Sequence, residues 1–202
     1  EVVIADSVKE IDTSAFLGCK KLVKVTIGAN TTKIGTKAFK DCGKLKTIIV
    51  RSKKLKRIGK NAFSAREDLE SVSIPKTVET LGRYAFYNCK KLKSISLYDS
   101  VEDYYDGVIK QCHCLEEVKL TQLRGDYSVM KELLADTDRR LHFRIEPCGL
   151  QLTFPAYVYN FVEDVEARVL HHKIEGSGYP YRNVSQERAW ICWRMTVCFR
   201  RW

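Results

Sequence analysis

The fold is decided by the stretch that runs Ile34-Gly35-Thr36-Lys37-Ala38-Phe39-Lys40-Asp41-Cys42-Gly43-Lys44-Leu45-Lys46-Thr47-Ile48-Ile49-Val50. Its apolar residues recur along the first 120 residues. The Phe position is held by Phe16, Phe39, Phe63, Phe86 and Ile109, which are 23, 24, 23 and 23 residues apart. Each copy also keeps Ala or Val one residue before this position, Leu six residues after it, and aliphatic residues nine and eleven residues after it. A fixed period of this length indicates a repeat architecture.

The physics of one copy follows from its pattern. The segment Leu-x-x-Ile-x-Ile ends in an alternation of apolar and other residues, which predicts a short strand with one buried face. Gly35, Gly59 and Gly82 follow an apolar residue and predict the start of a turn. We expect the Ala-Phe pair to lie on a short helical or 3₁₀ segment that directs Phe inward. Because no copy can bury its apolar residues alone, stacking predicts a right-handed solenoid with one parallel sheet along one side.

The pattern Ile-Gly-x-x-Ala-Phe-x-x-Cys-x-x-Leu-x-x-Ile-x-Ile resembles the BspA-like class of leucine-rich repeats. The resemblance covers residues 3–121 and implies an α/β repeat solenoid, with a strand and a short helix or 3₁₀ turn in each copy. It also implies a surface or secreted binding module of bacteria or protozoa, without activity of its own. The fifth copy departs from the pattern, because residues 104–109 lack its Gly and Phe signals.

Two regions are predicted: a solenoid of five repeats over residues 1–121, and a helix followed by a β-rich cap over 122–202. Residues 126–128 can cap a short helix that runs through Leu134. Alternation over 141–145 and 150–154 predicts strands, and prolines at 147 and 155 end them. Alternation also marks residues 190–202. This last stretch is interpreted as an edge strand, as a basic membrane or partner contact, or as a non-native tail.

The outward positions of the predicted strands form a candidate binding face. They are Lys24, Thr26, Thr47, Ile49, Ser71, Ser73, Ser94, Ser96, Glu117 and Lys119. The face is rich in hydroxyl groups and has no aromatic cluster, which argues against a protein interface centred on aromatic anchors. A polar or glycan-like ligand and plain solvation both fit this composition. The expected partner is therefore a protein or a glycan.

The net charge of the chain is +10. Residues 1–122 hold 23 Lys and Arg against 15 Asp and Glu, so +8 of this charge lies on the repeats. A ridge of Lys20, Lys21, Lys44, Lys90 and Lys91 is interrupted by Glu67 and Asp68 in the third copy and carries no aromatic residues. Specific nucleic-acid binding is therefore not expected. The alternative function is a basic protein that binds anionic membrane or nucleic acid through the repeats and the 190–202 strand. No apolar run is long enough to span a bilayer.

Cys19, Cys42, Cys89 and Cys112 occupy one repeat position, where the third copy has Arg66. Their side chains point the same way in parallel, which is poor geometry for bridging, so we expect a ladder of free thiols. Cys112-His113-Cys114 is a weak metal candidate, because adjacent residues of an extended chain point to opposite faces. The chain lacks the common catalytic motifs, and His171 and His172 are read as exposed strand residues. No catalytic residue, metal or cofactor is expected.

Overall fold

The computed structural model describes residues 1–121, 123, 128–137, 140–146 and 149–154. These residues belong to one compact unit, Glu1–Tyr157. The second unit, Val158–Trp202, lies outside the described residues, and with it the predictions for His171, His172 and the 190–202 strand.

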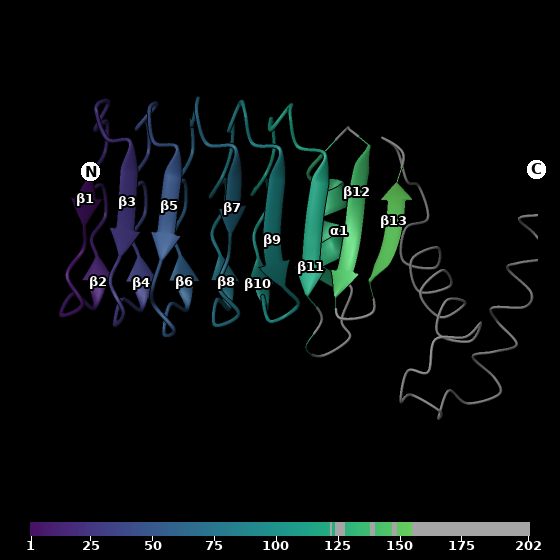
Figure 1. Cartoon of the computed structure of the whole chain (residues 1–202), viewed down its shortest axis with the longest axis horizontal. Helices are drawn as coiled ribbons and strands as arrows, with labels where there is room; N and C mark the ends of the chain where they lie inside the picture. Colours follow the sequence, from purple (N-terminus) through teal and green to yellow (C-terminus); the bar gives the residue numbers. More distant parts are fainter. Residues whose placement is uncertain (122, 124–127, 138–139, 147–148, 155–202) are drawn as a thin grey trace, which may run out of the picture. The chain divides into compact units, whose positions relative to one another are not determined.

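A row of parallel strands runs along one side of the solenoid (Figure 1). The strands are β1 (Val2–Val3), β3 (Lys24–Ile27), β5 (Thr47–Val50), β7 (Ser71–Ser73), β9 (Ser94–Tyr98) and β11 (Glu117–Thr121). Equivalent residues of successive copies face each other, as Val25 faces Ile48 and Ile95 faces Val118. These are the predicted Leu-x-x-Ile-x-Ile strands. β1 adds a strand one period before β3, so the row holds one strand more than the five copies counted above.

A second parallel sheet lies across the coil from this row. It consists of β2 (Glu10–Ile11), β4 (Lys33–Ile34), β6 (Arg57–Ile58), β8 (Thr80–Leu81) and β10 (Asp103–Tyr104). The expectation of a single sheet was therefore wrong. The apolar residue five positions before each Phe lies in these short strands. Two residues are too few to show the alternation by which strands are predicted.

The Ala-Phe segment is a pair of turns, not the predicted helical or 3₁₀ segment. Two residues per copy have positive φ, two positions before and two positions after the Phe position; Lys37 (φ 56°) and Asp41 (φ 58°) are the pair around Phe39. The N–H of Phe39 donates to the carbonyl oxygen of Ala62 in the next coil at 2.9 Å. In an α-helix this N–H would donate to residue i−4 instead. Successive coils are therefore joined by backbone hydrogen bonds on this side too.

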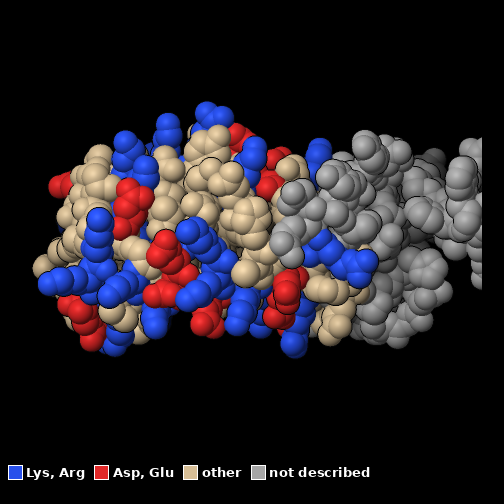
Figure 2. Space-filling model, turned by 90° about the horizontal axis from the view of Figure 1, so that it is seen from above, with Lys and Arg blue, Asp and Glu red and all other residues tan. Residues whose placement is uncertain are grey.

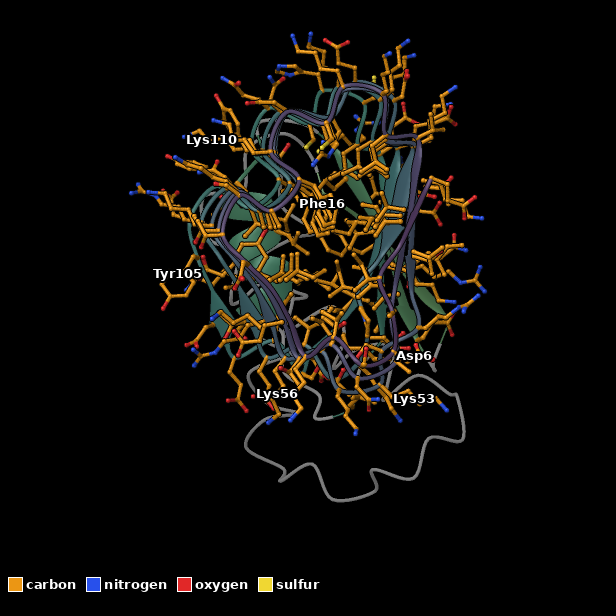
Figure 3. All side chains as sticks on the ribbon, turned by 90° about the vertical axis from the view of Figure 1, so that its left-hand side faces the viewer. Asp6, Phe16, Lys53, Lys56, Tyr105 and Lys110 are labelled. Atoms are coloured by element: carbon orange, nitrogen blue, oxygen red, sulfur yellow. The ribbon has the colours of Figure 1, made fainter. Side chains whose placement is uncertain are left out.

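The Phe side chains form a stacked column inside the coil, and Figure 3 shows Phe16 pointing into the interior. Ring centroids of Phe16, Phe39, Phe63 and Phe86 are 5.0, 5.3 and 5.4 Å apart, with planes within 9° of parallel. A further interior column was not predicted from the sequence. Its residues lie three positions before the apolar residue of each strand of the second sheet. Its members are Thr31, Leu55, Val78 and Val101, all buried.

Gly59 shows why the repeat keeps glycine before this turn. A Cβ atom at Gly59 would lie 2.7 Å from the carbonyl carbon of Gly35, and one at Gly82 would lie 2.6 Å from that of Gly59. Contacts this short with backbone atoms cannot be relieved by rotating a side chain. The glycines therefore allow the coils to approach each other at this corner.

The solenoid continues beyond the fifth copy. Helix α1 (Ser128–Ala135) replaces the turn and buries Val129, Met130 and Leu133, and β12 (Leu141–Glu146) pairs in parallel with β11. β13 (Leu150–Phe154) pairs antiparallel with β12. The predicted helix and the two predicted strands are thus present.

Asp136 follows α1 and terminates the hydrogen-bond ladder of the turns. Its carboxylate accepts the N–H groups of Gly107 at 2.7 Å and Ile109 at 3.3 Å, which in earlier copies donate to the next coil. It also accepts the hydroxyl of Tyr104 at 3.0 Å. Burial raises the pKa of Asp136, while these three hydrogen bonds act in the opposite direction.

Candidate binding surfaces

The predicted binding face is divided between two sheets, because β5 and β7 are not hydrogen-bonded to each other. Lys24, Thr47 and Ile49 lie on the sheet β1-β3-β5. The serines at 71, 73, 94 and 96 lie on the sheet β7-β9-β11-β12-β13, together with Glu117 and Lys119. Thr26 does not belong to an accessible face, because it is only 3% exposed.

The second of these sheets carries the longer polar surface, which we call the serine face. It comprises the outward residues Ser71, Ser73, Ser94, Ser96, Glu117, Lys119, His142, Arg144, Gln151 and Thr153. The last four were not predicted as part of it. The alternation of residues 141–145 was visible, but nothing in the repeat indicated that this strand would join β11 in parallel. Helix α1 precedes this strand. The spacing along the chain between the facing residues Val118 and Phe143 also differs from the repeat length of 23 or 24 residues.

The charged end of the serine face is held by local contacts. Glu146 accepts Arg144 Nε at 2.8 Å and lies 3.8 Å from Lys119 Nζ. His142 Nδ1 lies 2.8 Å from Thr153 Oγ1. The serine end is uncharged, with hydroxyls on neighbouring strands about 4.8 Å apart. The face therefore offers an uncharged hydroxyl array next to a charge-balanced group.

The lysine ridge is largely neutralised where its sign reverses. Lys90 pairs with Glu67 at 3.3 Å and Lys91 pairs with Asp68 at 2.8 Å. The hydrogen bond with Lys91 lowers the pKa of Asp68, and the same bond raises the pKa of Lys91. Figure 2 shows Lys and Arg interspersed with Asp and Glu on the face above these turns. The acidic residues of copy three therefore form ion pairs with lysines of copy four, within the molecule.

The repeat cysteines form the expected ladder of free thiols, of which Cys42, Cys89 and Cys112 are buried and Cys19 is exposed. Each buried thiol donates to the Phe carbonyl oxygen of the preceding coil, as Cys42 Sγ does to Phe16 O at 3.0 Å. Burial raises the pKa of the Cys42 thiol. Within the described residues, no group of three or more His, Cys, Asp or Glu could hold a metal ion.

Arg66 occupies this cysteine position in the third copy and is fully buried. Within the described part of the chain, its Nε, Nη1 and Nη2 atoms have no hydrogen-bond partner. Burial lowers the pKa of its guanidinium, opposed by the neighbouring groups of Cys42, Cys89 and Asp41. The sequence showed the replacement but not the burial, because arginine at one turn of a solenoid is normally read as a surface residue. Along the chain, Arg66 precedes β7, the strand that is not hydrogen-bonded to β5.

No helix among the described residues is long and apolar enough to cross a bilayer.

Comparison with known proteins places the repeats in a family. A family model described as "BspA type Leucine rich repeat region (6 copies)" matches residues 1–122. Its six copies agree with the six strands of the first row, β1, β3, β5, β7, β9 and β11. Curated protein sequences yield no match.

Several solved structures share the fold. A leucine-rich repeat protein of T. pallidum is 30% identical, with a TM-score of 0.56 over 59% of this chain and 57% of that protein. A leucine-rich cell surface protein of Faecalibacterium prausnitzii is 26% identical, with a TM-score of 0.59 over 65% of this chain and 34% of that protein. The pneumococcal vaccine antigen PcpA is 23% identical, with a TM-score of 0.61 over 71% and 36%, and shows likeness of fold alone. The chain thus spans only part of each of these structures.

Proposed function

The chain belongs to the BspA-type leucine-rich repeat family, and we propose that it is a non-catalytic binding or adhesion module that recognises a protein or glycan through the serine face. The family and its structural neighbours suggest binding or adhesion at a cell surface or outside the cell. The partner and the surface that recognises it are our proposal.

The single observation that carries the choice of surface is the continuity of the serine face. It extends over five hydrogen-bonded strands, from β7 to β13, whereas the sheet β1-β3-β5 has three. In solenoids, stacking of equivalent positions creates the extended surfaces that bind partners. Ser73 and Ser96 face each other on β7, the edge strand of this sheet, and on β9 beside it. Small hydroxyl side chains leave room for a polar ligand to approach the sheet closely.

The composition of the serine face fits a glycan partner better than it fits a protein interface centred on aromatic anchors. The outward positions of the described strands of this sheet hold one aromatic residue, Tyr98 at the end of β9, and one arginine, Arg144. They therefore lack the cluster of Trp, Tyr and Arg in which protein hot spots are enriched. Its hydroxyl, amide and imidazole groups can donate and accept hydrogen bonds, as sugar hydroxyls require. A glycan is therefore the favoured partner, with a polar protein surface as the other.

The experiment is an array of glycans and extracellular matrix proteins, probed with the full chain at physiological salt. Ser96→Arg places a bulky cation on β9, within the hydroxyl-rich part of the serine face. Thr47→Arg is the matched control, because it adds the same side chain at an exposed outward position on the other sheet. We expect selective binding that Ser96→Arg abolishes and Thr47→Arg retains. Equal binding by both variants would exclude the serine face.

A further inference from the structure

The loop after β5 is the most basic segment of the molecule. Residues 51–57 read Arg-Ser-Lys-Lys-Leu-Lys-Arg, so five of seven residues are Lys or Arg, and we call this segment the basic loop. It lies in the 24-residue copy, whose additional residue falls between β5 and β6. The surrounding sequence has the same sign: residues 13–60 contain 14 Lys and Arg against one acid, Asp41. The positive charge of the repeats is therefore concentrated in the first half of the solenoid.

The conformation of the basic loop is fixed by its two uncharged residues. Ser52 is 3% exposed; its Oγ donates to the carbonyl oxygen of Thr31 at 2.6 Å and accepts the N–H of Lys54 at 3.0 Å. Leu55 is fully buried in the interior column that also contains Val78. All five cations are exposed as a result. The loop is thus held in place before any ligand binds, which reduces the entropy cost of binding.

The cations of the basic loop are only partly compensated. Lys56 pairs with Glu79 at 2.9 Å, and Lys54 Nζ donates to the neutral Asn30 side chain at 2.9 Å. Within the described residues, no ion pair involves Arg51, Lys53 or Arg57. Neighbouring coils add charge at the same corner.

Lys76, which holds the position of Lys53 one copy later, adds a cation at this corner. Lys33 faces Arg57 across β4 and β6 and is itself paired with Glu10 at 3.0 Å. Figure 3 shows Lys53 and Lys56 projecting from the same edge of the coil. Cations on three successive coils therefore line one edge of the solenoid.

This arrangement fits a repeating polyanion. Runs of Lys and Arg over five to eight residues are typical of nucleic-acid or heparin patches. The only aromatic residues in 13–60 are Phe16 and Phe39, which stack on each other in the interior column, so none is available to stack on bases. Sulfate groups along a polysaccharide can meet cations spaced about 4.8 Å apart on successive coils. We propose that the basic loop, with Lys33 and Lys76, binds a sulfated polysaccharide at a site separate from the serine face.

The test measures binding of a fluorescent heparin oligosaccharide to the full chain by anisotropy at several salt concentrations. The loop variant is Arg51→Gln/Lys53→Gln/Arg57→Gln. The matched control is Lys20→Gln/Lys21→Gln/Lys44→Gln, which removes the same charge from exposed lysines of other turns. We expect the loop variant to bind at least about tenfold more weakly at physiological salt, with a shallower salt dependence because fewer counterions are released. The control should change affinity less than about twofold, because removing distant charges alters only the general attraction.

Two outcomes would overturn the proposal. Equal weakening by the loop variant and the control would show that net charge alone attracts heparin. Duplex DNA that competes as well as heparin, and better than desulfated heparin, would assign the loop to nucleic acid instead. Circular dichroism of both variants checks that the fold is retained. Because neither variant touches the serine face, failure here leaves the glycan-array result unaffected.

Discussion

Arg66 places three polar nitrogen atoms inside the solenoid without a hydrogen-bond partner in the part of the chain that is described. A buried guanidinium is costly unless it is paired, and apolar replacements of similar volume can stabilise a protein. We therefore predict that Arg66→Met raises the free energy of unfolding by about 1–3 kcal/mol. Urea denaturation followed by circular dichroism measures this directly. A loss of stability would mean that the guanidinium is satisfied by a contact with the rest of the chain.

Phe63 is the opposite case, since it fits its site closely. It is 1% exposed and stacks between Phe39 and Phe86. We expect Phe63→Ala to lower the free energy of unfolding by about 3–5 kcal/mol, because it empties a core site between two coils. Leu17→Ala is the control, because Leu17 is 46% exposed, and should cost less than about 0.5 kcal/mol. A cost below 1 kcal/mol for Phe63→Ala would contradict the stacked core.

Most of the buried residues could be predicted individually, and the exceptions have physical reasons. The Phe, Leu and Ile columns were visible because large apolar residues repeat at one position. The interior column of Thr31, Leu55, Val78 and Val101 was not, because it begins with a polar residue and the extra residue in copy two shifts Leu55. The positions with positive φ could not be predicted, because residues such as Lys37 and Tyr84 occupy them rather than glycine.

Backbone hydrogen bonds join successive coils at the turns as well as along the strands. Gly59 allows two of these coils to approach within backbone contact distance. We predict that Gly59→Ala destabilises the chain by about 1–3 kcal/mol, because its Cβ would overlap the backbone of Gly35 and Thr36. Gly43→Ala is the matched control, since its nearest contact would be Glu67 Oε2 at 3.8 Å, and it should be nearly neutral. Thermal unfolding of the two variants side by side decides whether the close approach is required.

Helix α1 acts through the residue that follows it. Asp136→Ala leaves the N–H groups of Gly107 and Ile109 and the hydroxyl of Tyr104 without their acceptor. We expect a loss of about 2–4 kcal/mol, which is less than the sum of three hydrogen bonds because a partly buried charge is also removed. Hydrogen exchange should show faster exchange at the Gly107 and Ile109 amides than in copies one to three. Unchanged protection of these amides would show that Asp136 is dispensable.

Whole elements were predicted unevenly. Alternation predicts the strands of the first row, β3, β5, β7, β9 and β11, but not the second sheet, because pairing between coils rather than side-chain pattern defines that sheet. The serine face was half predicted: its serines come from the repeat, but His142 and Arg144 come from a strand outside the period. The basic loop was visible only as part of the total charge. The positive charge of the loop gathers at one edge because Ser52 and Leu55 are buried and the five cations are left exposed.

For the whole unit, stability is expected to depend on the number of copies. Inserting a second copy of residues 16–38 before Phe39 supplies all six apolar positions and a further interface between coils. We predict a folded chain with a larger denaturant m-value and a larger free energy of unfolding, because more surface is buried by the same contacts. Insertion of the same residues in scrambled order is the control. Aggregation or loss of the cooperative transition in the unscrambled variant would show that copy number is fixed by other constraints.

The hydrogen-bond ladder of the turns has a direction, because alternate N–H groups of a turn, such as those of Lys37, Phe39 and Asp41, donate to the coil that follows. The far end of such a ladder would present unpaired donors to any second molecule with free carbonyls, as the edge of an open sheet does. The carboxylate of Asp136 occupies two of those donors, the N–H groups of Gly107 and Ile109, and another solenoid would have to displace and bury it in order to add itself there. Asp136, together with helix α1 in the place of the next turn, thus makes this end of the turn ladder a poor template for polymerisation into fibres.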